Sequence, residues 1–317
     1  MASIPASSDP IRLALIGAGR WGRNYLRTLT ATEGVALAAV ASGNPDTAAL
    51  CPPGCRLFTH WRAMLAAGGL DGVIIASPPA SHAEIAEAVI RQGLAVLIEK
   101  PLTLDHGQAL RLRQVAADHP VLIQVGHIHL AAPAWRRLKQ LVDRIAPVRG
   151  IRAVAGARGP YRPDVGVLWD WGAHDVAMCL DIARTMPDRV DARLLDRRAV
   201  ADGTAERISI RLGFGALEAE IVLGTDMDKT RRFELTGAGG TLVYDDLAPA
   251  KLTLDGQAVP IERHPPLAVQ VQDFAAAIRA GSTDMSGLEL GIAVVEILDR
   301  CQSLSASWRD DQGHAGI

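Results

Sequence analysis

The sequence predicts an α/β protein in which an N-terminal, doubly wound parallel sheet is followed by an α+β domain with a largely antiparallel sheet. Three observations predict this class. Short apolar runs alternate with helical segments in the first part of the chain, the first run leads into a glycine-rich turn, and strand-like runs with few helices follow Gly126. With 317 residues the chain is long enough for two domains, which we expect at 1–126 and 127–317.

The parallel sheet is predicted from six apolar runs separated by helical segments. Helical periodicity is clearest over His82–Arg91, where apolar residues recur three and four apart between Ser81 as the expected N-cap and Gly93. Strands that are buried on both faces read as continuous apolar runs, and right-handed crossovers between them produce a doubly wound sheet. The expected strands are Ile11–Ile16, Val35–Val40, Arg56–Phe58, Gly72–Ala76, Ala95–Ile98 and Val121–Val125.

The second half is predicted to form its sheet from consecutive strands joined by short turns. Glycine-containing segments at 213–215 and 237–240 are typical of such turns in antiparallel sheets. The expected strands are Val148–Val154, Val190–Leu195, Ala205–Leu212, Leu217–Leu223, Arg231–Leu235 and Thr241–Tyr244. The expected helices are Pro133–Ile145, Leu267–Arg279 and Leu288–Ser305.

Composition narrows the class of function. A net charge of −2 supplies no basic face for duplex nucleic acid, so we expect no nucleic-acid partner. No apolar run reaches the ~18 residues of a membrane span, and the first residues lack the pattern of a secretory signal, so we expect a cytoplasmic protein without a membrane partner. The cysteines show no zinc-ligand spacing, so no metal is expected; they are Cys51, Cys55, Cys179 and Cys301.

The turn after the first strand has the G-x-G-x-x-G spacing of a dinucleotide-binding loop. Gly17 allows a tight turn, Gly19 lets a pyrophosphate approach the backbone, and Gly22 lets the following helix pack closely on the sheet. The N-terminus of that helix presents free N–H groups and a partial positive charge to the anion. We therefore predict a Rossmann domain whose dinucleotide-binding loop is Gly17, Ala18, Gly19, Arg20, Trp21 and Gly22.

The end of the second strand bears on which dinucleotide is bound. An acidic residue that holds the adenosine ribose is expected there, about 20 positions after the loop. The sequence has Ser42 and Asn44 at this place and no carboxylate, so nothing repels a 2′-phosphate and both side chains can donate hydrogen bonds. We therefore favour NADP over NAD, although we find no Arg or Lys near this strand end to reinforce the preference.

The ends of the fourth and fifth strands are expected to face the cofactor, because ligands of doubly wound sheets bind at the carboxyl ends of the strands. Ser77 and Pro78 follow the fourth strand, and His82 opens the next helix. Glu99 and Lys100 end the fifth strand. The Lys100 ammonium could hydrogen-bond a substrate hydroxyl and stabilise its alkoxide character, the alternative being a solvated surface lysine.

In the second domain, Trp169–Asp175 holds the candidate acid–base group. Asp170 and His174 are four residues apart and share a face if one helix includes both. A carboxylate beside an imidazole fixes its tautomer and raises its basicity, which makes His174 a candidate general base. The alternatives are that Asp170 caps the helix, that His174 is a core residue, and that Asp175 is the true partner of His174.

Four further residues are weaker candidates for substrate contacts: His129, Arg158, Tyr161 and Trp169. His127 and His129 would face the same side of a strand, so a metal pair is conceivable there. We favour a packing role for these two histidines, in a strand or in the cleft, over metal binding. His129 is then a candidate substrate contact.

These motifs together resemble the Gfo/Idh/MocA oxidoreductase family. The resemblance rests on the Gly17–Gly22 loop, on Ser77-Pro78 with His82, and on Glu99-Lys100-Pro101, and it covers essentially the whole chain. It implies hydride transfer between a nicotinamide and a carbinol carbon, without a metal, by a catalytic group of Lys100, Asp170 and His174. The strand-two end is similar to that of NADP-using members.

The resemblance further implies a cis Lys100–Pro101 peptide and a polyhydroxylated substrate, such as a sugar, cyclitol or sugar nucleotide. It also implies a homodimer or homotetramer, formed through the open face of the second sheet, where we expect an apolar patch. Two other functions stay open: a glycoside-cleaving enzyme that oxidises only transiently, and a dinucleotide-sensing regulator. The presence of Lys100, Asp170 and His174 together argues against the regulator.

Overall fold

The computed structural model describes residues 9–162 and 165–313, and the chain forms two compact units. Unit 1 comprises Met1–Ile128 and Pro265–Ile292, and unit 2 comprises His129–His264 and Ala293–Ile317. This division differs from the single boundary that we expected near residue 126, because a segment close to the C-terminus returns to the first unit. No helix among the described residues is both long and apolar enough to cross a membrane.

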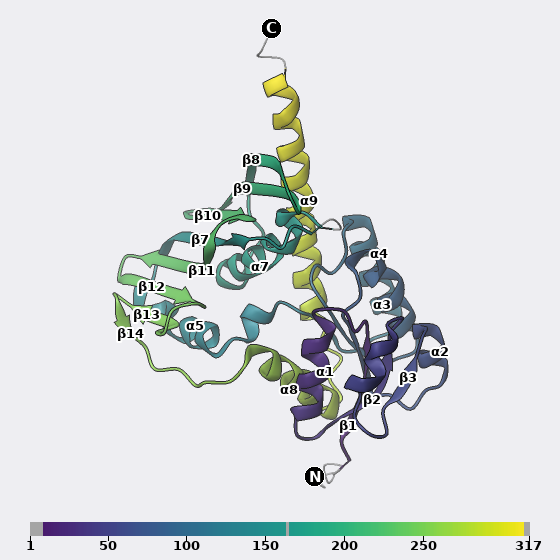
Figure 1. Ribbon diagram of the computed structural model, residues 1–317. Helices are drawn as coiled ribbons and strands as arrows, with labels where there is room; N and C mark the ends of the chain where they lie inside the picture. The colour runs from purple at the N-terminus through teal and green to yellow at the C-terminus, as the bar shows by residue number, and fades with distance from the viewer. Residues whose placement is uncertain (1–8, 163–164, 314–317) are drawn as a thin grey trace. The chain divides into compact units, whose positions relative to one another are not determined.

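Unit 1 confirms the doubly wound parallel sheet. Over the described ranges its strands lie in the order β3-β2-β1-β4-β5-β6, all parallel (Figure 1). The strands are β1 (Ile11–Ile16), β2 (Val35–Ala41), β3 (Arg56–Phe58), β4 (Gly72–Ile75), β5 (Ala95–Ile98) and β6 (Ile123–Val125). The α-helices are α1 (Gly22–Ala31), α2 (Trp61–Ala66), α3 (His82–Arg91), α4 (His106–Asp118) and α8 (Pro266–Arg279), and the 3₁₀ helices are η1 (Pro45–Leu50) and η2 (Pro79–Ser81).

The return of α8 to unit 1 has a packing cause. Leu267, Val271 and Phe274 lie on one face of this helix and are buried with β1 residues such as Leu13 and Leu15. The helix lies beside α1 on that side of the sheet (Figure 1). An amphipathic pattern predicts that a helix covers a core but does not say which core, so the local pattern of 266–279 could not assign it to unit 1.

Unit 2 is built on a mixed sheet. In the part of the chain that is described, its strand order is β14-β13-β12-β11-β7-β10-β9-β8; neighbours are antiparallel except the parallel pair β7 and β10. The strands are β7 (Val148–Arg158), β8 (Arg189–Val200), β9 (Gly203–Phe214), β10 (Leu217–Gly224), β11 (Asp226–Gly237), β12 (Gly240–Asp245), β13 (Leu252–Leu254) and β14 (Gln257–Ala258). The helices are η3 (Ile128–Ala131), α5 (Pro133–Ile145), α6 (Val167–Asp170), α7 (Gly172–Ala183) and α9 (Ser286–Gly313), of which η3 and α9 begin in unit 1.

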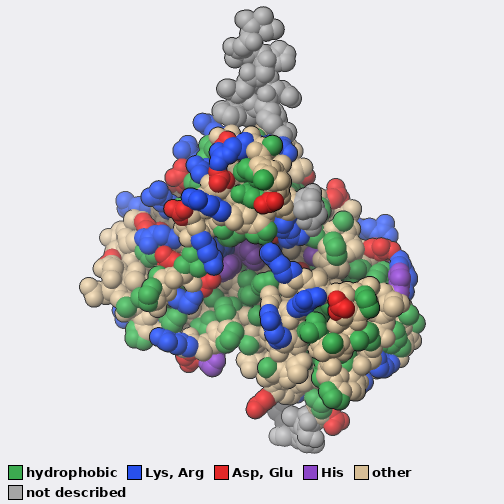
Figure 2. All heavy atoms as spheres, viewed as in Figure 1, with side chains coloured by type: hydrophobic (Ala, Val, Ile, Leu, Met, Phe, Trp, Pro, Cys, Tyr) green, Lys and Arg blue, Asp and Glu red, His purple; other side chains and the backbone are tan. Residues whose placement is uncertain are grey.

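One face of this sheet is covered by helices and the other is open and charged. Along one row of register partners the side chains alternate in sign across five strands: Glu234, Arg152, Glu220, Arg211 and Asp191. Directly opposed side chains lie on the same face of a sheet. Along this row the face carries charged side chains and not the apolar patch that we expected. Figure 2 likewise shows acidic and basic side chains interspersed where β8, β9 and β10 reach the viewed surface.

Candidate active site

The loop between β1 and α1 requires glycine at two places and leaves open space at a third. Gly17 has φ +94°, and a Cβ there would lie 2.7 Å from the backbone of Ala76. A Cβ on Gly22 would lie 2.0 Å from the carbonyl oxygen of Gly17. A Cβ on Gly19 would meet nothing within 4 Å, so this backbone faces space that a pyrophosphate can occupy. The loop geometry therefore fits a dinucleotide.

Beside this loop lies a cavity of about 350 Å³, lined by Ala18, Gly19, Arg20, Arg23, Ser42 and Asn44. It brings two guanidinium groups to the end of β2, whereas from the sequence we found no Arg or Lys near this strand end. That expectation was wrong because the cations come from the glycine loop and the first turn of α1. The spacing of Arg20 and Arg23, three residues apart at the start of a helix, was the signal that could have found them.

Ser42 and Asn44 are held in place by the loop itself. Ser42 Oγ lies 2.8 Å from Thr47 Oγ1 and accepts a hydrogen bond of 3.1 Å from the backbone N–H of Asn44. Asn44 Oδ1 accepts from the backbone N–H of Asp46 at 3.0 Å, so the NH₂ end of this side chain is the end that can donate to a ligand. Thr47 was not predicted, and it is buried beneath the two predicted residues.

His82 joins the loops that follow β4 and β5. Its ring is buried, with Nδ1 2.9 Å from the carbonyl oxygen of Pro101 and Nε2 2.9 Å from that of Ser77. Burial lowers the pKa of His82, against the opposing effect of these carbonyls. The Lys100–Pro101 peptide is cis, as expected. His82 thus fixes the backbone on both sides of the expected nicotinamide position rather than presenting its ring to solvent.

Glu99, next to Lys100, is the centre of a buried polar network. Its Oε1 accepts a hydrogen bond of 2.6 Å from the Tyr25 hydroxyl, and its Oε2 accepts one of 3.1 Å from the Lys100 backbone N–H. Burial raises the pKa of Glu99. Gly126 makes room for this carboxyl group, since a Cβ there would lie 2.7 Å from Glu99 Oε1. Tyr25 also lies within hydrogen-bond distance of Gln270 of α8, so the network ties α1, β5 and α8 together.

Lys100 is half-buried at the end of β5, and His127 lies within its electrostatic reach. Burial, together with the Lys100 charge, lowers the pKa of His127 to about 3. The expectation that His127 and His129 share one side of a strand was wrong. The strand β6 ends at Val125, and the chain continues as η3, with His127 in unit 1 and His129 in unit 2.

In unit 2, Asp170 and His174 lie on two successive helices rather than one. Asp170 ends α6 and His174 lies in the first turn of α7, with Trp171 between the helices. The helix break brings Gly172 close to β10, where a Cβ would lie 3.1 Å from Leu223 Cδ1. Asp170 Oδ1 accepts a hydrogen bond of 3.2 Å from Arg162 Nη1. The acidic side chain is therefore positioned by Arg162, a contact that we did not predict.

His174 belongs to a cluster with His129 and Tyr244. The two imidazole rings meet edge to face with centroids 5.0 Å apart, and His129 Nδ1 lies 3.0 Å from the Tyr244 hydroxyl. Burial raises the pKa of Tyr244, so its hydroxyl stays protonated and serves as a hydrogen-bonding group. His129 was predicted as a substrate contact, whereas Tyr244 comes from β12 and carried no sequence signal.

Asp175, the alternative partner that we considered for His174, forms an ion pair with Arg231. The distance from Arg231 Nη1 to Asp175 Oδ2 is 2.8 Å, and the two side chains are 7% and 2% exposed. Burial raises the pKa of Asp175, and the Arg231 charge opposes this rise. The pair joins α7 to β11 directly beneath the turn of helix that carries His174.

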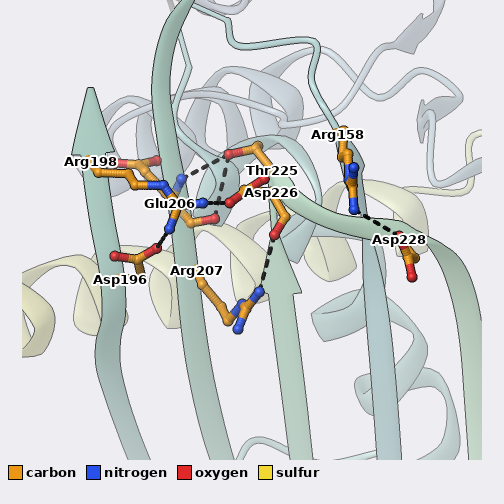
Figure 3. A network of polar contacts seen from close by, with 8 residues as sticks. All are labelled: Arg158, Asp196, Arg198, Glu206, Arg207, Thr225, Asp226 and Asp228. Atoms are coloured by element: carbon orange, nitrogen blue, oxygen red, sulfur yellow. Dashed lines mark hydrogen bonds and ion pairs between the residues drawn. The ribbon is translucent and has the colours of Figure 1, made fainter. Parts of the chain in front are cut away.

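The remaining predicted contacts have different environments. Arg158 makes an ion pair of 3.3 Å with Asp228, and both side chains are largely exposed (Figure 3). Trp169 is buried and its indole N–H donates to Gln302 Oε1 of α9. Tyr161 lines a cavity together with Asp170. Of these three residues, Tyr161 is thus the one that the structure brings together with a predicted catalytic residue.

Comparison with known proteins identifies the family. The sequence profile of the Gfo/Idh/MocA oxidoreductase family, with its NAD-binding Rossmann fold, matches residues 11–127. A crystal structure from Magnetospirillum magnetotacticum MS-1, described in general terms as an oxidoreductase, is 45% identical with a TM-score of 0.89, and the match covers 92% of this chain and 100% of that one. The chain belongs to the Gfo/Idh/MocA oxidoreductase family.

Two relatives with named activities are less similar to this Gfo/Idh/MocA protein than the Magnetospirillum chain is. It is 25% identical over 321 residues to inositol 2-dehydrogenase of Rhizobium meliloti (strain 1021), a match that covers 91% of this chain and 95% of the relative. It is 32% identical over 203 residues to UDP-N-acetylglucosamine 3-dehydrogenase of Acidithiobacillus ferrooxidans, with coverage of 61% and 60%. The protein is an NAD(P)-dependent oxidoreductase whose Rossmann domain binds the dinucleotide.

Proposed function

We propose that the protein transfers a hydride between a nicotinamide and a carbinol carbon of a sugar, cyclitol or sugar nucleotide. The observation that carries this proposal is that β1, β4 and β5 end at the same edge of one sheet. At this edge β1 leads into the open loop at Gly19, β4 is followed by Ser77, and β5 is followed by Lys100. This edge is where doubly wound folds bind their ligands. The substrate class is supported by the inositol and sugar-nucleotide relatives.

In this mechanism the dinucleotide, when bound, supplies the hydride chemistry, and the protein supplies position and proton transfer. His174 takes the proton from the substrate hydroxyl during oxidation and returns it during reduction. Lys100 donates a hydrogen bond to the same oxygen and stabilises its alkoxide character. Asp170, held by Arg162, orients the imidazole, and His129 with Tyr244 packs against its other side.

A turnover panel tests this function. Purified protein is mixed with NADP⁺ or NAD⁺ and a set of inositols, hexoses, amino sugars and their nucleotides, and absorbance of the reduced nicotinamide is followed. We expect reduction with at least one polyhydroxylated substrate. Tight dinucleotide binding with no reduction across the panel would instead favour the transiently oxidising enzyme or the sensor.

We further propose that the cofactor is NADP. The cavity next to the glycine loop combines the Arg20 and Arg23 guanidinium groups with the Ser42 hydroxyl and the Asn44 amide, a donor-rich lining that suits a 2′-phosphate. No carboxylate lines this cavity among the described residues.

Changing Ser42 to Asp is expected to lower the ratio of kcat/KM for NADP⁺ to kcat/KM for NAD⁺ about 100-fold. The new carboxylate would repel the 2′-phosphate and would pair with the arginines. The control Thr30→Asp adds the same charge to α1 outside this cavity and should leave the ratio unchanged. Equal loss for both dinucleotides in Ser42→Asp would show that the residue does not read the phosphate.

We also propose a homodimer through the open face of the unit 2 sheet, with a homotetramer as the larger alternative. The row of alternating charges is self-complementary. A two-fold axis between Arg152 and Glu220 would oppose Arg152 to Glu220 of the partner subunit, and Glu234 to Arg211 of the partner subunit.

Light scattering at low and at high salt measures this association. We expect a dimer that weakens as salt rises, because exposed ion pairs are screened. Arg152→Glu should lower the dimer fraction, and the double exchange Arg152→Glu with Glu220→Arg should restore it. A monomer at every salt concentration would overturn the proposal.

A further inference from the structure

Unit 2 contains a cavity of about 340 Å³ to which the proposed mechanism assigns no role. It lies between residues 160–162, the start of α6 and the tip of the β8–β9 hairpin, and its lining includes Tyr161, Asp170, Trp171 and Glu206. Its size is at the lower end of the range of about 300–1,000 Å³ that is typical of small-molecule pockets. It therefore suits a single ring rather than a nucleotide.

The charges that line this cavity are largely paired. Arg162 Nη1 lies 3.2 Å from Asp170 Oδ1, and Arg197 Nε lies 3.5 Å from Glu206 Oε1. Glu206 Oε2 also accepts from the Val167 backbone N–H at 3.1 Å. Paired guanidinium and carboxylate groups offer fixed donors and acceptors without a strong net charge. A hydroxyl both donates and accepts, so vicinal hydroxyls match this lining better than a phosphate does.

Two aromatic side chains, Tyr161 and Trp171, complete the lining. The hairpin tip packs directly against Tyr161: Gly203 has φ +147°, and a Cβ there would lie 2.7 Å from Tyr161 Cβ. The turn is therefore shaped around this aromatic residue. Aromatic rings present an apolar surface with a large contact area, on which the C–H face of a sugar ring can pack.

The hairpin is anchored, so the cavity is preformed. Arg198 contacts both Asp196 and Asp226, which joins β8 to the start of β11 (Figure 3). The backbone N–H of Glu206 donates to Thr225 Oγ1 at 2.8 Å, and that of Thr225 donates to the Glu206 carbonyl at 2.9 Å. Figure 3 shows these groups from adjacent strands pointing toward one another. Both Glu206 and Thr225 line the cavity.

From these observations we infer that the cavity is a subsite for an uncharged sugar ring that is attached to the reacting ring. The inference rests on the proposed function, since the cavity is connected to the chemistry through Asp170, which lines it and belongs to the proposed catalytic group. The preferred substrate is then a glycoside or disaccharide rather than a free monosaccharide. Asp202 also lines the cavity and disfavours an anionic substituent.

The experiment compares kcat/KM for the monosaccharide that gives turnover and for disaccharides built on it. The wild type should prefer a disaccharide at least about 10-fold. Thr204→Trp, which places a bulky ring at an exposed lining position, should abolish this preference and leave monosaccharide turnover within about twofold. Leu247→Trp adds the same ring at an exposed position outside the cavity and should change neither value.

A second measurement separates failure of this inference from failure of the proposed function. Saturation-transfer NMR with methyl hexopyranosides reports binding whether or not turnover occurs, and Thr204→Trp should remove the part of the signal that comes from the cavity. Turnover of a monosaccharide without a disaccharide preference, and with a glycoside signal that Thr204→Trp leaves unchanged, would overturn the subsite and leave the proposed function standing. A glycoside signal without turnover of any sugar would support the cavity as a sugar site and overturn the dehydrogenase activity.

Discussion

Replacing His174 by alanine is expected to lower kcat about 10²–10⁴-fold and to leave the dinucleotide Kd unchanged. Loss of a positioned general acid or base has an effect of this size. The dinucleotide loop belongs to unit 1 and His174 to unit 2, so the substitution leaves the residues of the loop in place. Steady-state kinetics gives kcat, and fluorescence titration with the reduced dinucleotide gives Kd.

Two further variants test the assignment of the catalytic group. Lys100→Ala should also lower kcat, because it removes the proposed hydrogen bond to the substrate oxygen. His60→Ala, which removes an exposed imidazole from unit 1, should leave kcat as it is. Undiminished activity in both His174→Ala and Lys100→Ala would mean that the catalytic group lies elsewhere.

Replacing Arg231 by methionine is expected to lower the free energy of unfolding by about 3–5 kcal/mol. Removing one partner of a buried ion pair leaves the other charge without compensation in a low-dielectric environment. Asp175 is 2% exposed, so water cannot take the place of the guanidinium without rearrangement. Urea unfolding followed by circular dichroism measures the change.

The double variant Arg231→Met with Asp175→Leu should recover most of that loss, because it removes both charges and fills the space with apolar groups. Arg158→Met breaks the exposed pair with Asp228 and should leave unfolding almost unchanged, since exposed ion pairs contribute little. A loss of less than about 1 kcal/mol in Arg231→Met would contradict a stabilising role for the buried pair.

The geometry of the dinucleotide loop could be predicted from the local sequence, whereas the grouping of cations beside it could not. The roles of Gly17, Gly19 and Gly22 depend on residues within one turn and on the strand that precedes them, so their spacing predicted the geometry that the structure shows. The sequence placed Arg20 in this loop, but it did not predict that Arg20 and Arg23 line a cavity together with Ser42. Their relevance depends on β2 lying beside β1, which brings Ser42 toward the loop.

In unit 2 the sequence singled out His174, Asp170 and His129 as candidates, but it gave no sign of Tyr244 or Arg231 beside them. Tyr244 reaches His129 from 115 residues away, and Arg231 reaches Asp175 from 56 residues away. Such pairs follow from strand order and register, which no local pattern specifies. The charged open face could not be predicted for the same reason. The sequence of a single strand does not reveal that residues of opposite charge stand side by side across five neighbouring strands.

The sequence alone therefore determined the α/β class, the succession of strands and helices, and the glycine loop, because each depends on periodicity or spacing over a few residues. The tertiary structure decided which unit α8 completes, which cations face Ser42, and how the helix breaks between Asp170 and His174. It also decided that the β8–β9 hairpin closes a cavity over Tyr161. These features arise from packing between distant segments, whose free energy depends on the whole arrangement of the sheet.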